Sequence, residues 1–200
     1  PEIRGAVRRE ADDKNFNSEM TDPVGFNVRY GWSSNVGINA TVNPDFSQIE
    51  ADVAQINYDP RRSLFFPEKR PFFLDGIERF QTPTRLIYTR RIANPVAAGK
   101  IAGKFGANTV GFISAADNTG PSISEMDLSY VNALRLKRDL SDQNHMGMVL
   151  TDKSNKNRSN RVLAFDGRYV TKDIYSLRAQ GGFSQTNIDN ENGDIAPMWD

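Results

Sequence analysis

Apolar and polar residues alternate at every second position along much of this chain, and this alternation most constrains the possible fold. Over residues 26–32, aromatic and aliphatic side chains alternate with glycine or polar residues. After a polar turn at 33–35 the same pattern resumes over 36–42, which is typical of a β-hairpin. A period of two residues gives a strand one apolar and one polar face.

The second half of the chain repeats this pattern. Alternating segments lie at 100–105, 110–112, 128–139, 146–150, 163–169 and 175–184. The connections between them differ in length: those near Asn108, Ser141 and Lys172 are short, whereas longer polar ones are expected at 117–127, 152–160 and 187–194. Short and longer connections that alternate between strands of about ten residues are typical of an outer-membrane barrel.

A sandwich of two antiparallel sheets would show the same alternation. Two observations favour the barrel. The strands exceed the ~5–6 residues of ordinary globular sheets, and charged residues lie deep within the polar face, as a wet interior permits: Arg135, Lys137, Asp166, Arg168 and Arg178. We predict an all-β fold of antiparallel hairpins that form part of an outer-membrane-type β-barrel.

Composition sets outer limits on partners and on domain organisation. The formal net charge is +0, which argues against nucleic acid as a partner, and the absence of cysteine excludes disulfides and zinc–thiolate sites. No apolar run approaches the ~20 residues of a membrane helix. A start at Pro1 and an end soon after a loop-like run indicate one partial barrel domain, residues 1–200, of a longer chain.

One stretch, residues 43–84, interrupts the hairpins. It combines acids, a basic pair and two aromatic clusters around the charged turn 67–71, a mixture that needs a buried, polar-lined host. We expect an irregular or short-helical segment (about 44–84), with Pro67 in a first helical turn. It would fold inward as a plug held by ion pairs. The structural alternative is a periplasmic cap that meets no substrate.

The candidate binding residues are the charged side chains of this segment and of the flank that follows it. We predict that they line the plug or the interior of the barrel: Asp45, Glu50, Asp52, Arg61, Arg62, Glu68, Arg70, Asp75, Arg90 and Arg91.

The run VNPDFSQIEADVAQINYDPRRSLFFPEKRPFFLDG, residues 42–76, and the later LIYTRRI, residues 86–92, resemble the signature of domain-of-unknown-function family 5916. Members of that family carry an N-terminal carbohydrate-binding family-9-like β-sandwich and a C-terminal region regarded as an outer-membrane β-barrel. The resemblance implies export to the outer membrane of a Gram-negative bacterium, with outer-membrane lipid as a partner. It implies no established biochemical activity.

Catalytic patterns are weak. The one histidine, His145, follows a turn. The chain contains no nucleophile elbow of the G-x-S-x-G type that could work with it. Glu50 and Asp52 could serve as a glycosidase pair, but the neighbouring arginines would keep both ionised. The acidic run 189–194 lacks the spacing of a calcium loop. We therefore predict no catalytic residue, no metal site and no cofactor.

Three functions remain open on the sequence. The leading one is an outer-membrane barrel that binds or passes a solute, such as a glycan or another small molecule. The alternative is a carbohydrate-active hydrolase of the cell envelope, which would act on glycosidic bonds. A second alternative is a soluble β-sandwich that serves as a binding module.

Overall fold

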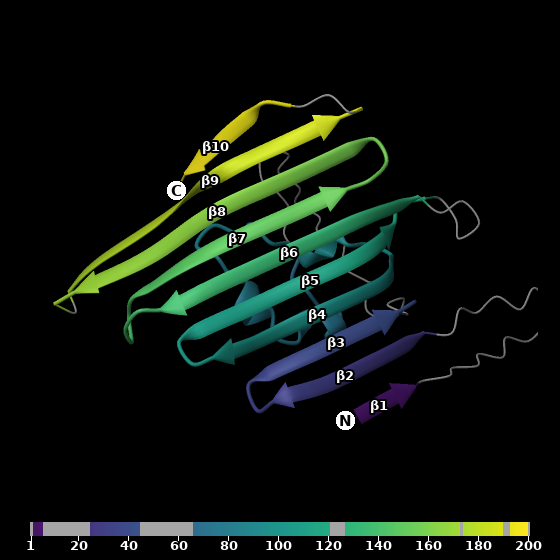
Figure 1. Cartoon of the computed structure of the whole chain (residues 1–200), viewed down its shortest axis with the longest axis horizontal. Coiled ribbons are helices and arrows are strands. Elements are labelled where there is room, and N and C mark those ends of the chain that lie inside the picture. Colours follow the sequence, from purple (N-terminus) through teal and green to yellow (C-terminus); the bar gives the residue numbers. More distant parts are fainter. Residues whose placement is uncertain are drawn as a thin grey trace, which may run out of the picture.

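A single antiparallel sheet of ten strands, in sequence order from β1 to β10, forms the frame of the protein (Figure 1). The computed structural model describes residues 2–5, 25–44, 66–120, 127–172, 174–189 and 193–199. The strands are β1 (Glu2–Gly5), β2 (Phe26–Ser33), β3 (Val36–Val42), β4 (Pro95–Phe105), β5 (Asn108–Asn118), β6 (Leu128–Asp139), β7 (His145–Ser154), β8 (Arg158–Thr171), β9 (Tyr175–Ile188) and β10 (Ile195–Trp199). The predicted all-β antiparallel class is confirmed, and within these ranges the sheet is open.

The connections differ between the two ends of the sheet. At one end, which we call the short-turn end, residues 34–35, 106–107, 140–144 and 172–174 join successive strands. At the opposite end lie the longer connections 119–127 and 189–194 and, between β3 and β4, residues 43–94. The prediction of a longer connection at 152–160 is wrong, because β7 and β8 extend to leave only 155–157. There the Asn155 side chain accepts the backbone N–H of Arg158 at 2.8 Å and closes a tight turn.

One face of the sheet, the apolar face, carries a long row of apolar side chains, and toward the end opposite the short turns the same face also bears the charged pair Asp152 and Arg161. Register partners place this row across nine strands: Tyr30, Ile38, Ile101, Phe112, Leu134, Leu150, Leu163, Phe183 and Pro197. Cross-strand pairs of this kind stabilise a sheet and fix its register. Yet Phe165 and Phe183 of this face are 53% and 55% exposed, so the apolar surface has no cover within the described residues.

The opposite face, the polar face, holds charged and hydroxyl side chains at the alternate positions. Several are almost fully buried, among them Lys100, Asp117, Ser129 and Arg135, each about 1% exposed. Their burial comes in part from the connection between β3 and β4. Its described part, residues 66–94, is called the seated segment below. In Figure 1 its helical turns lie behind the middle strands.

Helical structure in the described part of the chain is confined to this segment: α1 (Pro71–Leu74) and the 3-10 turns η1 (Ile77–Phe80) and η2 (Thr89–Arg91). The predicted short helical turns are therefore present, but the expected start at Pro67 is wrong. Pro71 forces Arg70 into an extended conformation, ψ 123°, so the helix begins at Pro71 itself. None of the helices described has the length and apolarity needed to span a membrane.

Candidate functional site

The seated segment is a compact insertion whose sequence dictates its turns. Pro71 starts α1, and Gly76 ends it with a left-handed φ of 69°, a conformation that glycine adopts without strain. η1 follows directly and brings Phe80 onto the sheet. The chain then returns through η2 to β4.

An aromatic anchor fixes the middle of the segment. Phe73 is fully buried and Phe80 is nearly so, and both belong to one cluster with the sheet residues Ala98, Ile113 and Ala115. The residue beneath Phe80 is Gly111, where a Cβ atom would lie 2.9 Å from the phenyl ring. Glycine at that position therefore allows the close approach of the ring to the sheet.

Lys100 of β4 is the main polar anchor. Its side chain is fully buried, and its ammonium group donates to the backbone carbonyl oxygens of Phe72 and Asp75 at the end of α1. The Nζ atom also lies 5.2 Å from the centroid of the Phe72 ring. A buried ammonium needs such acceptors, because burial without them would cost several kcal/mol.

Asp75 joins the segment to the strands on the other side of β4. Its carboxylate accepts from Asn39 of β3 at 2.8 Å and from Arg29 of β2 at 3.2 Å. The Nζ atom of Lys100 lies 4.0 Å from the same carboxylate. One acid thus connects three strands to the end of α1.

Glu68 and Arg70 form a buried pair within the segment. The guanidinium donates to both carboxylate oxygens at 2.9 Å, and Thr89 donates to the same carboxylate at 2.6 Å. Burial alone would raise the pKa of the Glu68 carboxyl, but the hydrogen bonds from Arg70 and Thr89 outweigh it and hold that pKa below its usual range. Glu68 is therefore ionised at neutral pH.

Arg70 also holds the two arms of the segment together. Nη1 donates to the carbonyl oxygen of Ile92 at 2.5 Å and Nη2 to that of Thr89 at 3.0 Å. Its Cζ atom lies 4.3 Å from the centroid of the Phe73 ring. This guanidinium therefore supplies hydrogen-bond donors to backbone carbonyl oxygens that would otherwise be buried without a partner.

Two further contacts close the ends of the segment. The carboxylate of Asp117 in β5 accepts the backbone N–H groups of Ala93 and Asn94, at 3.2 and 2.6 Å. Gln180 of β9 accepts the backbone N–H of Thr84 at 2.9 Å. The segment is consequently bonded to β2, β3, β4, β5 and β9.

The structure brings together some of the predicted site residues. Glu68, Arg70 and Asp75 are in the anchoring network described above, Arg90 lies over the ring of Phe66 at 5.7 Å, and Arg91 is exposed in η2. Five others lie outside the described residues: Asp45, Glu50, Asp52, Arg61 and Arg62.

Sequence reasoning missed the sheet residues that receive the segment: Arg29, Asn39, Lys100, Asp117 and Gln180. The available signal was strand parity, since each occupies a polar-face position next to apolar-face neighbours. Parity identifies the face on which a side chain lies, but not the contact that it makes there.

We next consider the residues of the described part of the chain that could bind a metal or act as a base. No cluster of three His, Cys, Asp or Glu side chains is placed there to hold a metal ion. His145 Nε2 lies 3.9 Å from Asp166 Oδ2, and that carboxylate is already bound by the guanidinium of Arg135.

The fold and the seated segment define an all-β protein that carries an ordered insertion on the polar face of one antiparallel sheet. The chain belongs to the family described as "Domain of unknown function (DUF5916)", which matches residues 5–104. That range includes the whole seated segment, β2, β3 and all of β4 except its last residue. No curated protein and no solved structure matches the chain.

Proposed function

We propose that this chain forms part of an outer-membrane β-barrel that binds or passes a solute, with the seated segment narrowing its interior. The observation that carries the proposal is the contrast between the two faces of one sheet. One face carries a row of apolar side chains across nine strands, several of them exposed, and the other is polar, charged and partly covered by a bonded insertion.

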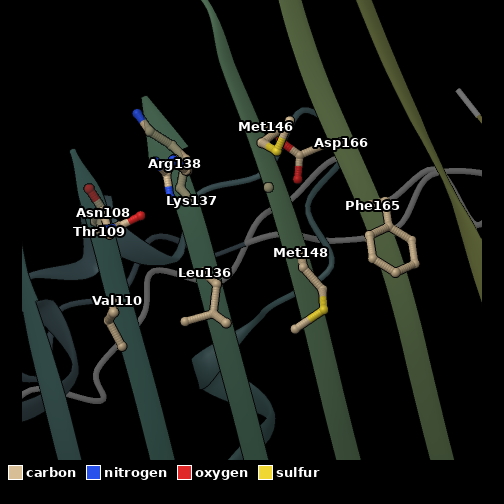
Figure 2. Close-up of a pocket in the computed structure, with 11 residues that line it drawn as sticks. Asn108, Thr109, Val110, Leu136, Lys137, Arg138, Met146, Met148, Phe165 and Asp166 are labelled. Atoms are coloured by element: carbon tan, nitrogen blue, oxygen red, sulfur yellow. The ribbon is translucent and has the colours of Figure 1, made fainter. Parts of the chain in front are cut away.

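The apolar face has the chemistry of a lipid-facing surface. Figure 2 shows Val110, Leu136, Met148 and Phe165 side by side on four neighbouring strands, around a shallow hollow. Register places them in one row. A monomeric protein in water rarely exposes so large an apolar patch, whereas a barrel wall in hydrocarbon requires one.

The polar face would line the interior, with the seated segment within it. The segment connects β3 to β4 at the end of the sheet that carries the longer connections. In outer-membrane barrels the longer connections are extracellular and the tight turns periplasmic. By that rule the segment is an outer loop folded inward, which supports a constriction rather than a periplasmic cap.

The family resemblance, through its carbohydrate-binding family-9-like partner domain, favours a carbohydrate-related molecule. Among the described residues of the polar face, hydroxyl, amide and charged groups are all present, as a site for a polar solute requires.

The test uses the full-length protein, extracted with detergent and reconstituted into planar bilayers. We expect extraction to require detergent and the reconstituted protein to conduct ions. Lys100→Met should raise the conductance, because it removes the donors that hold Phe72 and Asp75 against β4. Lys153→Met is the matched control, since Lys153 lies on the same face with no bond to the segment. A protein that stays monodisperse without detergent would overturn the proposal.

A further inference from the structure

One row of the polar face, close to the short-turn end, concentrates positive charge. Register partners place Asp139, His145, Arg168 and Arg178 in sequence across β6 to β9. Arg168 and Arg178 are direct cross-strand partners. The Cβ atoms of such partners lie about 4.5–5.5 Å apart, and like charges in this position destabilise a sheet. The two guanidinium groups therefore work against the pairing of β8 with β9.

The carboxylates nearby are already occupied by other cations. Asp139 accepts from Lys104 at 2.7 Å and lies 3.1 Å from Lys137. Asp166 accepts from both terminal nitrogens of Arg135, with Nη2 at 2.8 Å from Oδ2. Cations thus outnumber carboxylates on this part of the polar face.

Arg168 itself carries a second sign of an unfilled site. Its Nε atom is buried, and no acceptor for it exists among the described residues. A buried donor without a partner costs about 1–3 kcal/mol. Native structures seldom keep such a donor unless a ligand or a water satisfies it.

From these observations we infer that Arg168 and Arg178 form a binding site for an oxyanion, the phosphate or carboxylate group of an anionic solute. The inference deepens the proposed function and rests on it, because the polar face is the one proposed to line the barrel interior. A guanidinium binds such groups through two parallel N–H donors. An oxyanion between the two arginines removes their mutual repulsion and offers an acceptor to Arg168 Nε. Near the short-turn end, the site lies at the periplasmic mouth.

The experiment measures the binding of inorganic phosphate to the full-length protein in non-ionic detergent by calorimetry. Arg178→Gln and Arg168→Gln should each weaken binding roughly tenfold to a hundredfold, the usual effect of losing a charged hydrogen-bond partner. Arg178 is exposed, so its variant leaves the packing of the sheet unchanged. Arg178→Lys should also weaken binding, since it keeps the charge but loses the planar fork.

Lys153→Gln is the matched control. Lys153 lies on the polar face of β7, about 27 Å along the strand from the row of His145. This exceeds the Debye length of ~10 Å at 0.1 M salt, so its loss should leave phosphate affinity unchanged. No phosphate binding by the wild-type protein, or an equal loss in Lys153→Gln and Arg178→Gln, would overturn the inference.

Competition by a short-chain phosphatidylglycerol distinguishes the source of the oxyanion. We expect no displacement of phosphate, which identifies a free solute, whereas displacement would identify a lipid headgroup on the same two arginines. Bilayer conductance separates the two proposals. A conducting protein without phosphate binding would refute only this inference, and phosphate binding without conductance would refute only the barrel.

Discussion

The two faces of this sheet are specified in different ways. On the apolar face, neighbouring positions carry aromatic or aliphatic side chains in matching register, and most could exchange with one another. On the polar face, single residues make single contacts: Lys100 binds carbonyls of α1, Gln180 binds Thr84, and Gly111 admits Phe80. The comparison teaches that the same strand can need only an apolar side chain at each position on one face, while on the other face it needs a particular residue for a particular contact.

That difference predicts how substitutions act. The apolar rows should tolerate any apolar residue and reject an unpaired charge. The polar face should tolerate charge at open positions, yet lose much from the removal of one anchoring side chain.

The largest effect should come from Arg70→Met. It leaves the carboxylate of Glu68 buried without its guanidinium partner, a change that costs about 3–5 kcal/mol. The loss should appear in amide hydrogen exchange of Phe73 and Leu74, whose N–H groups donate to the backbone carbonyl oxygen of Arg70. Arg79→Met is the control: its pair with Glu78 is 3.5 Å long and exposed, worth less than about 1 kcal/mol. Equal exchange in both variants would contradict the buried pair.

Leu134→Arg tests the apolar face. In the proposed barrel the row of Leu134 would face lipid, where an arginine should cost up to about 2–4 kcal/mol, measured by denaturant unfolding in lipid vesicles. Ser184→Arg on the polar face is the control, because its row adjoins that of Leu134. We expect it to cost much less. If the two arginines cost the same, the faces do not differ in their surroundings.

Gly111→Ala tests the polar face by adding a single Cβ atom beneath Phe80. The new Cβ would approach the ring of Phe80 to 2.9 Å, and overpacking of this kind costs about 1–3 kcal/mol. Gly99→Ala is the control on the apolar face of β4, where a Cβ meets nothing within 4 Å. Thermal unfolding of the two variants should separate them, and a rescue of Gly111→Ala by Phe80→Leu would locate the strain.

The smallest effect should be a pH dependence of the seated segment. Because the folded-state pKa of Glu68 lies below its ordinary value of 4.5, the ionised carboxylate stabilises the folded segment fully above that value. This stabilisation is lost as the pH falls through the lower folded-state pKa. Hydrogen exchange of the Phe73 amide, compared with its intrinsic exchange rate at each pH, should therefore accelerate below about pH 4.5. Glu68→Gln should abolish the extra acceleration.

Much of the fold was predictable from the alternation of side chains. A period of two residues identifies strands and their faces, so the apolar rows through Leu134 and Phe165 follow from the sequence. The short-helical nature of the insertion was also predictable, because Pro71 and Gly76 limit any helix there. The length of the connection at 155–157 was not, since Asn155 stabilises a tight turn in a stretch that reads as a polar loop.

The candidate site was less predictable for a physical reason. Glu68 and Arg70 are two residues apart, so their pairing depends only on the local sequence. The remaining anchors join residues that only the register brings together, as Lys100 meets Phe72 and Gln180 meets Thr84. A surplus of possible ion pairs in a charged segment leaves the sequence unable to choose among them.

The bond between Gln180 and Thr84 has a consequence for the order in which the molecule forms. Every strand pairs with its immediate neighbours in the chain, so hairpins can add one after another with short loop closures. The segment is synthesised before β4, yet its last partner is in β9, 96 residues later. The bond between Thr84 and Gln180 therefore cannot form before β9 is in place, although Phe80 can already pack against β5. We expect protection of the Thr84 amide to appear later in folding than burial of Phe80.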